Sequence, residues 1–165
     1  MIKPAVFVFD VDGVMTDGKF YYTSDGKVMK RFGPDDNDAL SFLDNYMKIQ
    51  FISGDKRGFP ITEKRIGQDM NRSVELVSTV RRIEWIEKRY DPKTVIYMGD
   101  GIFDSLVFKK VAYSIAPANA DSYAKETANY VTNREGGDRA VAEAVFHVIE
   151  TFFTPINRDL IPIIK

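Results

Sequence analysis

The chain has 165 residues, 44% of them hydrophobic, so it is long enough for one domain with a buried core and too short for two independent ones. Its net charge of −1 provides neither a basic surface for nucleic acid nor an acidic tail, which leaves a small molecule as the expected partner. The sequence has no cysteine, no apolar signal core and no apolar run of membrane-spanning length, so we expect a cytoplasmic protein without disulfides or membrane contact.

The first predicted element is a buried strand that ends in two acids. Five apolar residues at 5–9 lead directly into Asp10 and Asp12, which are followed by Gly13. Alternate residues of a strand face the same way, so both carboxylates could share one direction while the chain stays extended, and Gly13 then lets it turn. Ligands of α/β sheets bind beyond the carboxyl ends of strands. Two acids there would repel each other without a cation, and oxygen-only ligands suit Mg²⁺.

A β-hairpin is predicted next. Residues 19–23 and 27–32 are β-prone and are separated by Ser24-Asp25-Gly26, in which Gly26 would adopt the positive φ of the turn. A two-stranded hairpin is only marginally stable alone in water, so this one needs a partner surface. That surface belongs either to another subunit or to the hairpin's own domain.

A helix opened by Pro34-Asp35-Asp36 and a short strand at 49–52 follow the hairpin. The apolar residues of this helix recur at helical spacing, which is typical of a core-facing surface: Ala39, Leu40, Phe42, Leu43 and Met47. The strand ends at Ser53-Gly54, ahead of a helix near 62–68. A hydroxyl and a glycine in this position suit a phosphate, because Ser53 offers a donor and Gly54 lets a backbone N–H approach.

A second pair of acids follows the fourth predicted strand. After a weak strand at 74–77, a helix at 79–90 is expected to bury Val80, Ile83 and Ile86, and Trp85 is expected to be packed or at an interface. The apolar strand 94–98 then runs into Asp100 and Asp104. Their spacing of i, i+4 at the start of a helix places both carboxylates on one side of a turn.

The remaining elements complete an alternating pattern. A strand at 112–116, a helix at 119–125, a strand stub at 130–131 and a helix at 140–153 are predicted. This alternation favours an α/β fold, a Rossmann-like three-layer sandwich with a mostly parallel sheet, a small β-hairpin flap and no large cap domain. We expect one domain over 1–153. The apolar, proline-interrupted tail 154–165 would be sticky if free, so packing on a neighbouring subunit is one solution. His147, in the last helix, is interpreted as a packing residue.

These motifs resemble those of the haloacid dehalogenase superfamily over roughly residues 2–152. The stretch from Asp10 to Gly18, DVDGVMTDG, is similar to the nucleophile motif DxDGx[TV]. Ser53 stands where the second motif is expected, and residues 99–104, GDGIFD, match the last motif, GDxxxD. The longer form of the first motif resembles the branch of the octulosonate and nonulosonate phosphate phosphatases and of the C-terminal domain of animal CMP-sialate synthetases. Residues 135–143 resemble the family's GGxGAxRE signature.

The resemblance implies a Mg²⁺-dependent phosphatase that hydrolyses a sugar-acid phosphate of the octulosonate or nonulosonate type, in lipopolysaccharide or sialic acid biosynthesis. Asp10 would attack phosphorus and become an aspartyl phosphate. Asp12 would protonate the departing sugar oxygen and then deprotonate the attacking water. In the tetrameric members of the family neighbouring flaps meet, and family members use C-terminal segments to cover the next active site. Together with the hairpin, the apolar tail and the absence of an inserted cap, this leads us to expect a homotetramer.

The same resemblance implies the ligands of the metal and of the phosphate. The side chains of Asp10 and Asp100 and the backbone carbonyl of Asp12 would hold Mg²⁺, while Asp104 would act through water or beside the metal ligands. The groups that would hold phosphate oxygens are Ser53 and the backbone N–H groups around Gly13 and Gly54.

Three positions depart from the family pattern. The superfamily's third motif is a lysine, and Ser78 stands where it is expected. Arg81 and Arg82 are the nearest cations, and we name Arg81 as a candidate for binding phosphate, although the planar fork of an arginine differs from the point charge of a lysine. Gly101 occupies a position where this branch usually has aspartate. Asp55 stands where octulosonate phosphatases carry arginine, whereas nonulosonate-specific relatives can have an acid.

Two other functions therefore stay open at this point. A catalytically weakened family member could serve as an oligomerisation or binding domain in sugar-nucleotide biosynthesis. Alternatively, the phosphoryl group could pass to an acceptor other than water.

Overall fold

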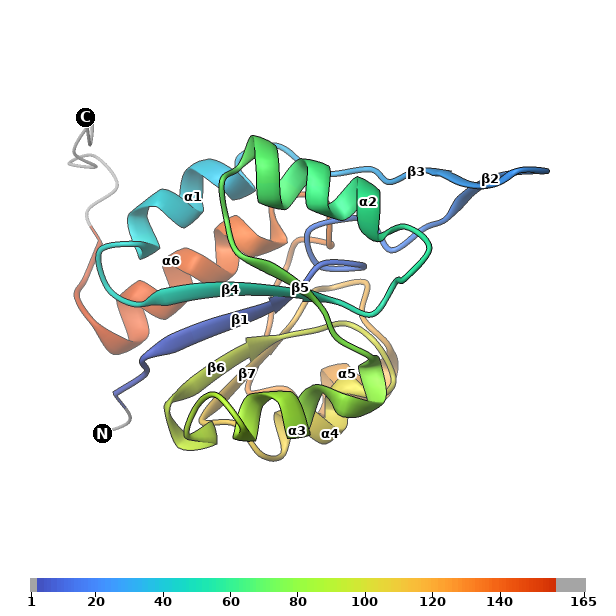
Figure 1. Ribbon diagram of the computed structural model, residues 1–165. Coiled ribbons are helices and arrows are strands. Elements are labelled where there is room, and N and C mark those ends of the chain that lie inside the picture. The colour runs from blue at the N-terminus through green and yellow to red at the C-terminus, as the bar shows by residue number, and fades with distance from the viewer. Residues whose placement is uncertain (1–2, 157–165) are drawn as a thin grey trace.

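The computed structural model describes residues 3–156, and its centre is a six-stranded sheet in the order β5–β4–β1–β6–β7–β8 (Figure 1). Its strand pairs are all parallel. The predicted α/β, Rossmann-like fold with a mostly parallel sheet is therefore confirmed. In chain order the strands are β1 (Val6–Asp10), β4 (Lys48–Ser53), β5 (Val74–Leu76), β6 (Val95–Met98), β7 (Tyr113–Ala116) and β8 (Tyr130–Val131).

Helices cover both faces of the sheet (Figure 1). One face carries α1 (Asp36–Leu43), α6 (Ala140–Phe152), and α2 (Phe59–Thr62) with its π-helical continuation Glu63–Asp69. The other face carries α3 (Arg82–Glu87), α4 (Asp104–Phe108) and α5 (Ser122–Thr127). Two short 3₁₀ turns, Thr79–Arg81 and Pro92–Thr94, precede α3 and β6.

The central strand β1 pairs with β4 along one edge and with β6 along the other, and the helices on either side of the sheet bury both of its faces. Alternate side chains enter different cores, as strand geometry requires. Phe7 and Phe9 pack in the core that contains α1 and α6, whereas Val6 and Val8 pack in the core that contains α3 and α4. The apolar run that leads to Asp10 thus anchors this residue in the middle of the sheet.

The predicted hairpin consists of β2 (Tyr21–Thr23) and β3 (Gly26–Met29), and Gly26 has the expected positive φ of 120°. We call residues 19–30, which contain both strands, the flap. It extends beyond the carboxyl ends of the central strands (Figure 1). Its outward side chains are apolar and more than half exposed: Phe20, Tyr22, Val28 and Met29.

One predicted helix is shorter than expected, and the prediction of its buried residues was partly wrong. The segment at 79–90 begins as a 3₁₀ turn, and α3 itself starts only at Arg82. A 3₁₀ turn winds more tightly than an α-helix, so its side chains do not point where an α-helix over 79–90 would place them. Val80 therefore points outward and is 69% exposed, whereas Arg82 and Trp85 are buried. The packing predicted for Trp85 is confirmed, and its indole N–H donates to Glu75 Oε2 at 3.0 Å.

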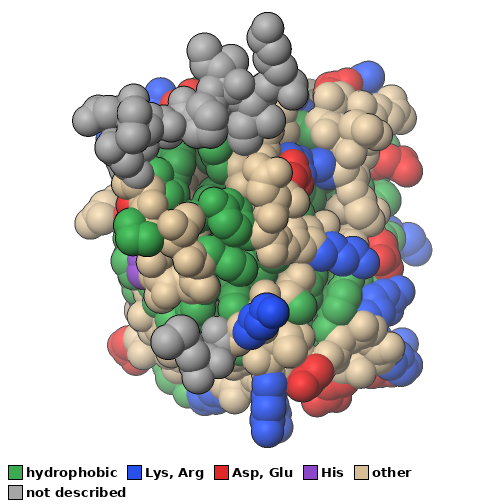
Figure 2. Space-filling model, turned by 90° about the vertical axis from the view of Figure 1, so that its left-hand side faces the viewer, with side chains coloured by type: hydrophobic (Ala, Val, Ile, Leu, Met, Phe, Trp, Pro, Cys, Tyr) green, Lys and Arg blue, Asp and Glu red, His purple; other side chains and the backbone are tan. Residues whose placement is uncertain are grey.

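The end of the molecule opposite the flap shows hydrophobic side chains gathered near the middle of its surface (Figure 2). Tyr46 and Phe153 lie 5.0 Å apart between ring centroids, and Ile156 packs against the core that contains α1 and α6. Most of the predicted tail, 157–165, falls outside the described residues, so its packing on a neighbour stays a prediction. Within 3–156, α6 is the longest helix at 13 residues, and neither it nor any other helix there could traverse a membrane.

Candidate active site

The sheet order places three strand ends side by side. Since β1 lies between β4 and β6, the residues that follow these strands meet at one edge of the sheet. A cleft of about 690 Å³ opens there, within the range of small-molecule sites. Its lining residues come from these strand ends, the flap, the 3₁₀ turn before α3, α3 and α4: Asp10, Asp12, Phe20, Gly54, Asp55, Thr79, Arg82, Asp100, Gly101, Ile102, Phe103 and Asp104.

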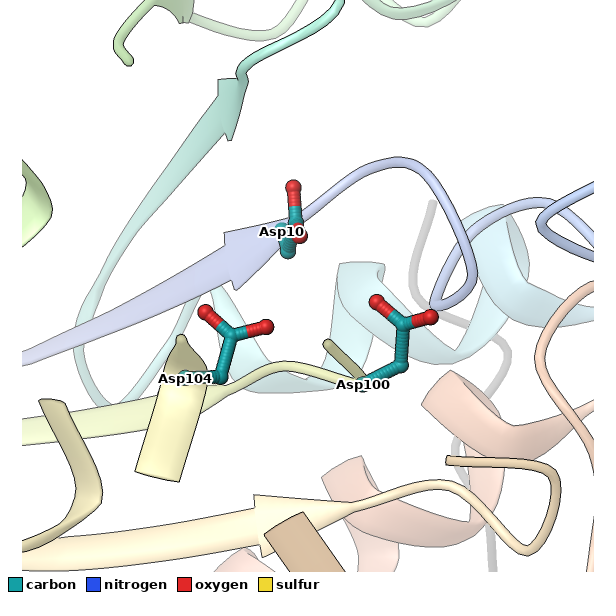
Figure 3. A group of neighbouring side chains, drawn as sticks. All are labelled: Asp10, Asp100 and Asp104. Carbon is teal, nitrogen blue, oxygen red and sulfur yellow. The ribbon is translucent and has the colours of Figure 1, made fainter. Parts of the chain in front are cut away.

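Three carboxylates converge in this cleft (Figure 3). One oxygen from each of Asp10, Asp100 and Asp104 lies within 4.8 Å of the others. Burial raises the pKa of Asp10 well above its ordinary value, Arg82 opposes this shift, and the neighbouring acids add to it. Burial and the charge of Asp104 raise the pKa of Asp100 to about 7. The predicted convergence of Asp10 and Asp100 is present, and the cluster holds more negative charge than Arg82 alone can balance.

Gly13 makes room for Asp100. A Cβ atom on Gly13 would overlap the Asp100 carboxylate, and the φ of +87° at Gly13 also favours glycine. The Gly13 N–H, which we expected to face phosphate, donates instead to Thr16 Oγ1 at 3.1 Å inside the turn. The sequence-based reason for this glycine was the freedom to turn, and the structure adds the space that the second acid needs.

Asp12 faces a different set of partners from Asp10. The chain leaves the extended conformation just after β1, where the N–H groups of Met15 and Thr16 donate to Val11 O, so the two acids do not share one direction. Ser53 Oγ donates to Asp12 Oδ2 at 2.7 Å. Lys30 Nζ lies 2.6 Å from Asp12 Oδ1. The side chain of Asp12 is thus outside the group of three acids, which leaves its backbone carbonyl as the possible metal ligand.

Arg82, rather than Arg81, is the cation beside the predicted nucleophile. Its side chain is 3% exposed, and Nη1 lies 2.8 Å from Asp10 Oδ2 and also pairs with Asp104 Oδ1. Burial opposes the charge of Arg82, but Asp10 and Asp104 outweigh it and raise its pKa. Arg81 is exposed and lines a separate shallow pocket with Trp85. This placement corrects the choice of Arg81 as a phosphate-binding residue.

Asp104 is held from three directions. Tyr97 donates its hydroxyl to Asp104 Oδ1 at 2.7 Å, the Gly101 N–H donates to Oδ2 at 2.9 Å, and Arg82 pairs with Oδ1. An acid with both oxygens engaged in this way fits a supporting position beside metal ligands. Sequence reasoning missed Tyr97. Its signal was a hydroxyl inside an otherwise apolar buried strand, which requires a partner.

Sequence reasoning also missed two lysines of the flap. Lys30 Nζ lies 3.0 Å from Asp55 Oδ2, and Lys27 pairs with the same oxygen. Burial would raise the pKa of Asp55, but hydrogen bonds from Lys27 and Lys30 lower it to about 2. Nothing in the sequence signals this cluster, because the lysines stand 25 or more positions before Asp55 and meet it only when the flap folds over the strand end.

A second cleft of about 690 Å³ lies between β8 and α6, and its polar groups bond to one another. Glu143 accepts hydrogen bonds from the Tyr130 hydroxyl and from Asn133. His147 stacks on Tyr130 at 3.7 Å and pairs with the Tyr113 hydroxyl, in agreement with the packing role expected for it. Burial lowers the pKa of His147. The acid cluster makes the cleft at the ends of β1, β4 and β6 the candidate active site.

Comparison with known proteins gives concordant matches. The family described as haloacid dehalogenase-like hydrolase matches residues 70–145. The 3-deoxy-D-manno-octulosonate 8-phosphate phosphatase KdsC of Salmonella typhi is 30% identical over 145 residues, which cover 84% of this chain and 75% of that protein.

Two solved structures share the fold. The cobalt-bound deoxy-D-mannose-octulosonate 8-phosphate phosphatase of Haemophilus influenzae has a TM-score of 0.79 and 24% identity, covering 91% of this chain and 90% of that chain. The Moraxella catarrhalis 3-deoxy-D-manno-octulosonate 8-phosphate phosphatase, solved with magnesium, phosphate and KDO, has a TM-score of 0.79 and 20% identity, with coverages of 90% and 87%.

Proposed function

Because the chain belongs to the haloacid dehalogenase-like hydrolases, in the branch of the 3-deoxy-D-manno-octulosonate 8-phosphate phosphatases, we propose that it is a Mg²⁺-dependent phosphatase of a sugar-acid phosphate. The observation that carries this proposal is the convergence of Asp10, Asp100 and Asp104 beside Arg82 at the carboxyl edge of the sheet. The substrate is an octulosonate or nonulosonate phosphate, in keeping with the substrate named for the KdsC relatives.

Asp10 is the nucleophile. It attacks phosphorus while the bond between phosphorus and the sugar oxygen breaks, which leaves an aspartyl phosphate. Asp12 gives its proton to the departing sugar oxygen and then takes a proton from the water that attacks the aspartyl phosphate. Phosphate leaves, and Asp10 is restored. Splitting the hydrolysis into two steps suits a reaction whose uncatalysed rate is among the slowest known.

The donor set fits Mg²⁺. Asp10 and Asp100 would supply carboxylate oxygens, and Asp12 would supply its backbone carbonyl; oxygen ligands are those that Mg²⁺ prefers. The space that Gly13 leaves for the Asp100 carboxylate supports the same assignment, since a side chain there would displace this ligand. When bound, Mg²⁺ offsets the repulsion between the carboxylates and the phosphate dianion.

Ser53 and Gly54 bind the phosphoryl oxygens. Ser53 Oγ is buried at the end of β4 and donates to Asp12, so it can turn its hydroxyl to a phosphate that enters beside Asp12. Gly54 lines the same cleft and leaves its backbone open to an anion. Arg82 replaces the lysine of the third motif, since its Nη1 lies 2.8 Å from Asp10. This position weakens the main argument for a degenerate binding domain, which was the missing lysine.

Phosphate release in the presence of Mg²⁺ tests the proposal. Purified protein is assayed against octulosonate and nonulosonate phosphates, with and without EDTA, next to Asp10→Asn. We expect Mg²⁺-dependent release that falls by at least about 10³-fold in the variant, because the nucleophile is lost. Absence of Asp10-dependent turnover with any of these substrates would reject the enzyme and favour a binding or oligomerisation domain. A phosphorylated acceptor without free phosphate would instead identify a phosphotransferase.

The functional form is a homotetramer of the cytoplasm. The exposed apolar side chains of the flap and the open cleft of a domain without a large cap support assembly, since a neighbouring subunit could close the cleft.

A further inference from the structure

Lys30 stands directly after β3, and its side chain is only 1% exposed. Its ammonium group has three acceptors: Thr62 Oγ1 at 2.8 Å, Asp12 Oδ1 at 2.6 Å and Asp55 Oδ2 at 3.0 Å. An ammonium group has three N–H donors, so all of them are used. The three acceptors belong to α2 and to the segments that follow β1 and β4. Lys30 therefore ties the base of the flap to two strand ends and a helix.

Asp12 is held from two sides. Lys30 contacts Oδ1, and Ser53 donates to Oδ2 at 2.7 Å, so the plane of the carboxyl group is set by two fixed donors. A general acid must lie within hydrogen-bond reach of the atom that it protonates, and a displacement of about 1 Å can cost on the order of 10²-fold in rate. Orientation of Asp12 is therefore a direct requirement of the proposed reaction.

The Lys30 side chain reaches Asp12 by passing close to Gly58, which has no side chain of its own. A Cβ atom on Gly58 would overlap the Asp55 carboxylate and would also lie 2.7 Å from Lys30 Cε and 2.8 Å from Lys27 Cδ. The φ of Gly58 is −94°, so backbone freedom does not explain a glycine there. The space explains it, because the Asp55 carboxylate and the stems of both lysines that pair with it lie at this point.

Resting on the phosphatase function proposed above, we propose that Lys30 is a positioning residue for proton transfer by Asp12. Because Lys30 belongs to the flap, this step then requires the flap to be folded against the ends of β1 and β4. As the bond from Asp10 to phosphorus forms and the bond from phosphorus to the sugar oxygen breaks, the Asp12 carboxyl proton passes to the sugar oxygen. Lys30 keeps its own protons and fixes the carboxyl orientation from Oδ1. When phosphate draws the Ser53 hydroxyl away, Lys30 becomes the remaining anchor of Asp12.

The test uses two leaving groups. A sugar oxygen needs a proton to depart, whereas p-nitrophenolate departs without one. For Lys30→Met we measure kcat/KM, which covers the steps up to formation of the aspartyl phosphate, with the sugar-acid phosphate and with p-nitrophenyl phosphate. We expect the ratio of the first value to the second to fall by about 10- to 100-fold, a part of the 10²- to 10⁴-fold that a general acid supplies.

The matched control is Lys27→Met, because Lys27 pairs with Asp55 and stands over the ring of Phe20. It should leave the ratio unchanged, whatever it does to the absolute rates. A second variant, Thr62→Val, removes one acceptor of Lys30 outside the cleft and should lower the ratio in the same direction by a smaller factor. This variant decides the question if Lys30→Met does not fold.

An unchanged ratio in both Lys30→Met and Thr62→Val, or an equal fall in Lys27→Met, would overturn the role of Lys30. Either result leaves the phosphatase function intact, since the wild-type protein is active in each case. A wild-type protein inactive on both substrates would reject the proposed function, and the role of Lys30 with it.

Discussion

At the scale of single residues, the candidate site brings together three acids and one buried arginine. Asp10, Asp100 and Asp104 lie together, with Arg82 as the cation that contacts two of them. Ion pairs buried to this degree rarely add much net stability, but removing one partner leaves an uncompensated charge. Arg82 therefore offsets part of the buried negative charge of Asp10 and Asp104 and helps to hold the acid cluster together.

Replacement of this cation should be costly. For Arg82→Met we expect the free energy of unfolding to fall by about 3 to 5 kcal/mol in the absence of Mg²⁺, because Asp10 and Asp104 lose their buried partner. Saturating Mg²⁺ should recover part of this loss, since the ion binds only the folded acid cluster. Urea unfolding with and without Mg²⁺ measures both effects.

The neighbouring arginine supplies the control. Arg81 is exposed, so Arg81→Met should change the free energy of unfolding by no more than about 0.5 kcal/mol and leave the phosphatase activity close to that of the wild type. Equal losses of stability or activity in the two variants would contradict the assignment of Arg82 as the site cation.

At the scale of elements, α1 and α6 meet through a buried acid. Asp36, in the first turn of α1, is 1% exposed, and its Oδ1 accepts the Ala142 N–H of α6 at 2.9 Å. The other oxygen, Oδ2, is buried without a hydrogen-bond partner among the described residues. Burial is the largest cause that raises the pKa of Asp36, to about 6. Burial of Asp36 between the two helices thus favours a protonated carboxyl, although the hydrogen bond from the Ala142 N–H acts in the opposite direction.

This raised pKa predicts a stability change with pH. Between pH 3.8 and about 6 the folded state binds more proton than the unfolded state, so the contribution of Asp36 is full below pH 3.8 and is lost as the pH rises through 6. Asp36→Asn cannot titrate. Its free energy of unfolding relative to the wild type should therefore rise by about 2 to 3 kcal/mol from pH 4 to pH 7.

Urea unfolding at a series of pH values gives this difference. The variant Asp35→Asn serves as a control, because Asp35 forms an exposed ion pair with Arg139 and should contribute less than about 1 kcal/mol. A difference between Asp36→Asn and the wild type that stays constant from pH 4 to pH 7 would refute the titration of Asp36 in this range.

At the scale of the whole molecule, apolar side chains of the flap and of the cleft edge are exposed to solvent. Four flap side chains are more than half exposed, and Ile102 across the cleft is 61% exposed. Several exposed large apolar side chains in one region commonly mark a protein–protein interface. The surface lies beside the cleft, where a neighbouring subunit could complete it.

We therefore expect light scattering at micromolar concentration to give the mass of a tetramer. Val28→Lys, which places a charge on the exposed side of the flap, should shift the population to smaller species. Val80→Lys is the matched control, since Val80 is 69% exposed but lies before α3 and not on the flap. A monomeric wild-type protein, or equal dissociation in both variants, would exclude assembly through the flap.

Local patterns were enough to predict much of the architecture and several site residues. The apolar run before Asp10, the turn at Gly26 and the spacing of Asp100 and Asp104 each depend on neighbouring residues, whose alternation and backbone preferences act over a few positions. The parallel sheet followed from the order of strands and helices, because crossover connections constrain the topology.

Only the tertiary structure decided which cations reach the acids. Arg81 and Arg82 are adjacent in sequence. Because α3 begins only after a 3₁₀ turn, the side chain of Arg82, and not that of Arg81, points toward the acids. Lys30 is distant in sequence from Asp55 and meets it through the fold of the flap. Asp12 lies toward Ser53 because the strand ends at Asp10 and the chain turns directly after it. The sequence by itself determined which acids stand at the strand ends. Which arginine or lysine pairs with each acid depended on contacts between distant segments, and local conformational preferences do not encode such contacts.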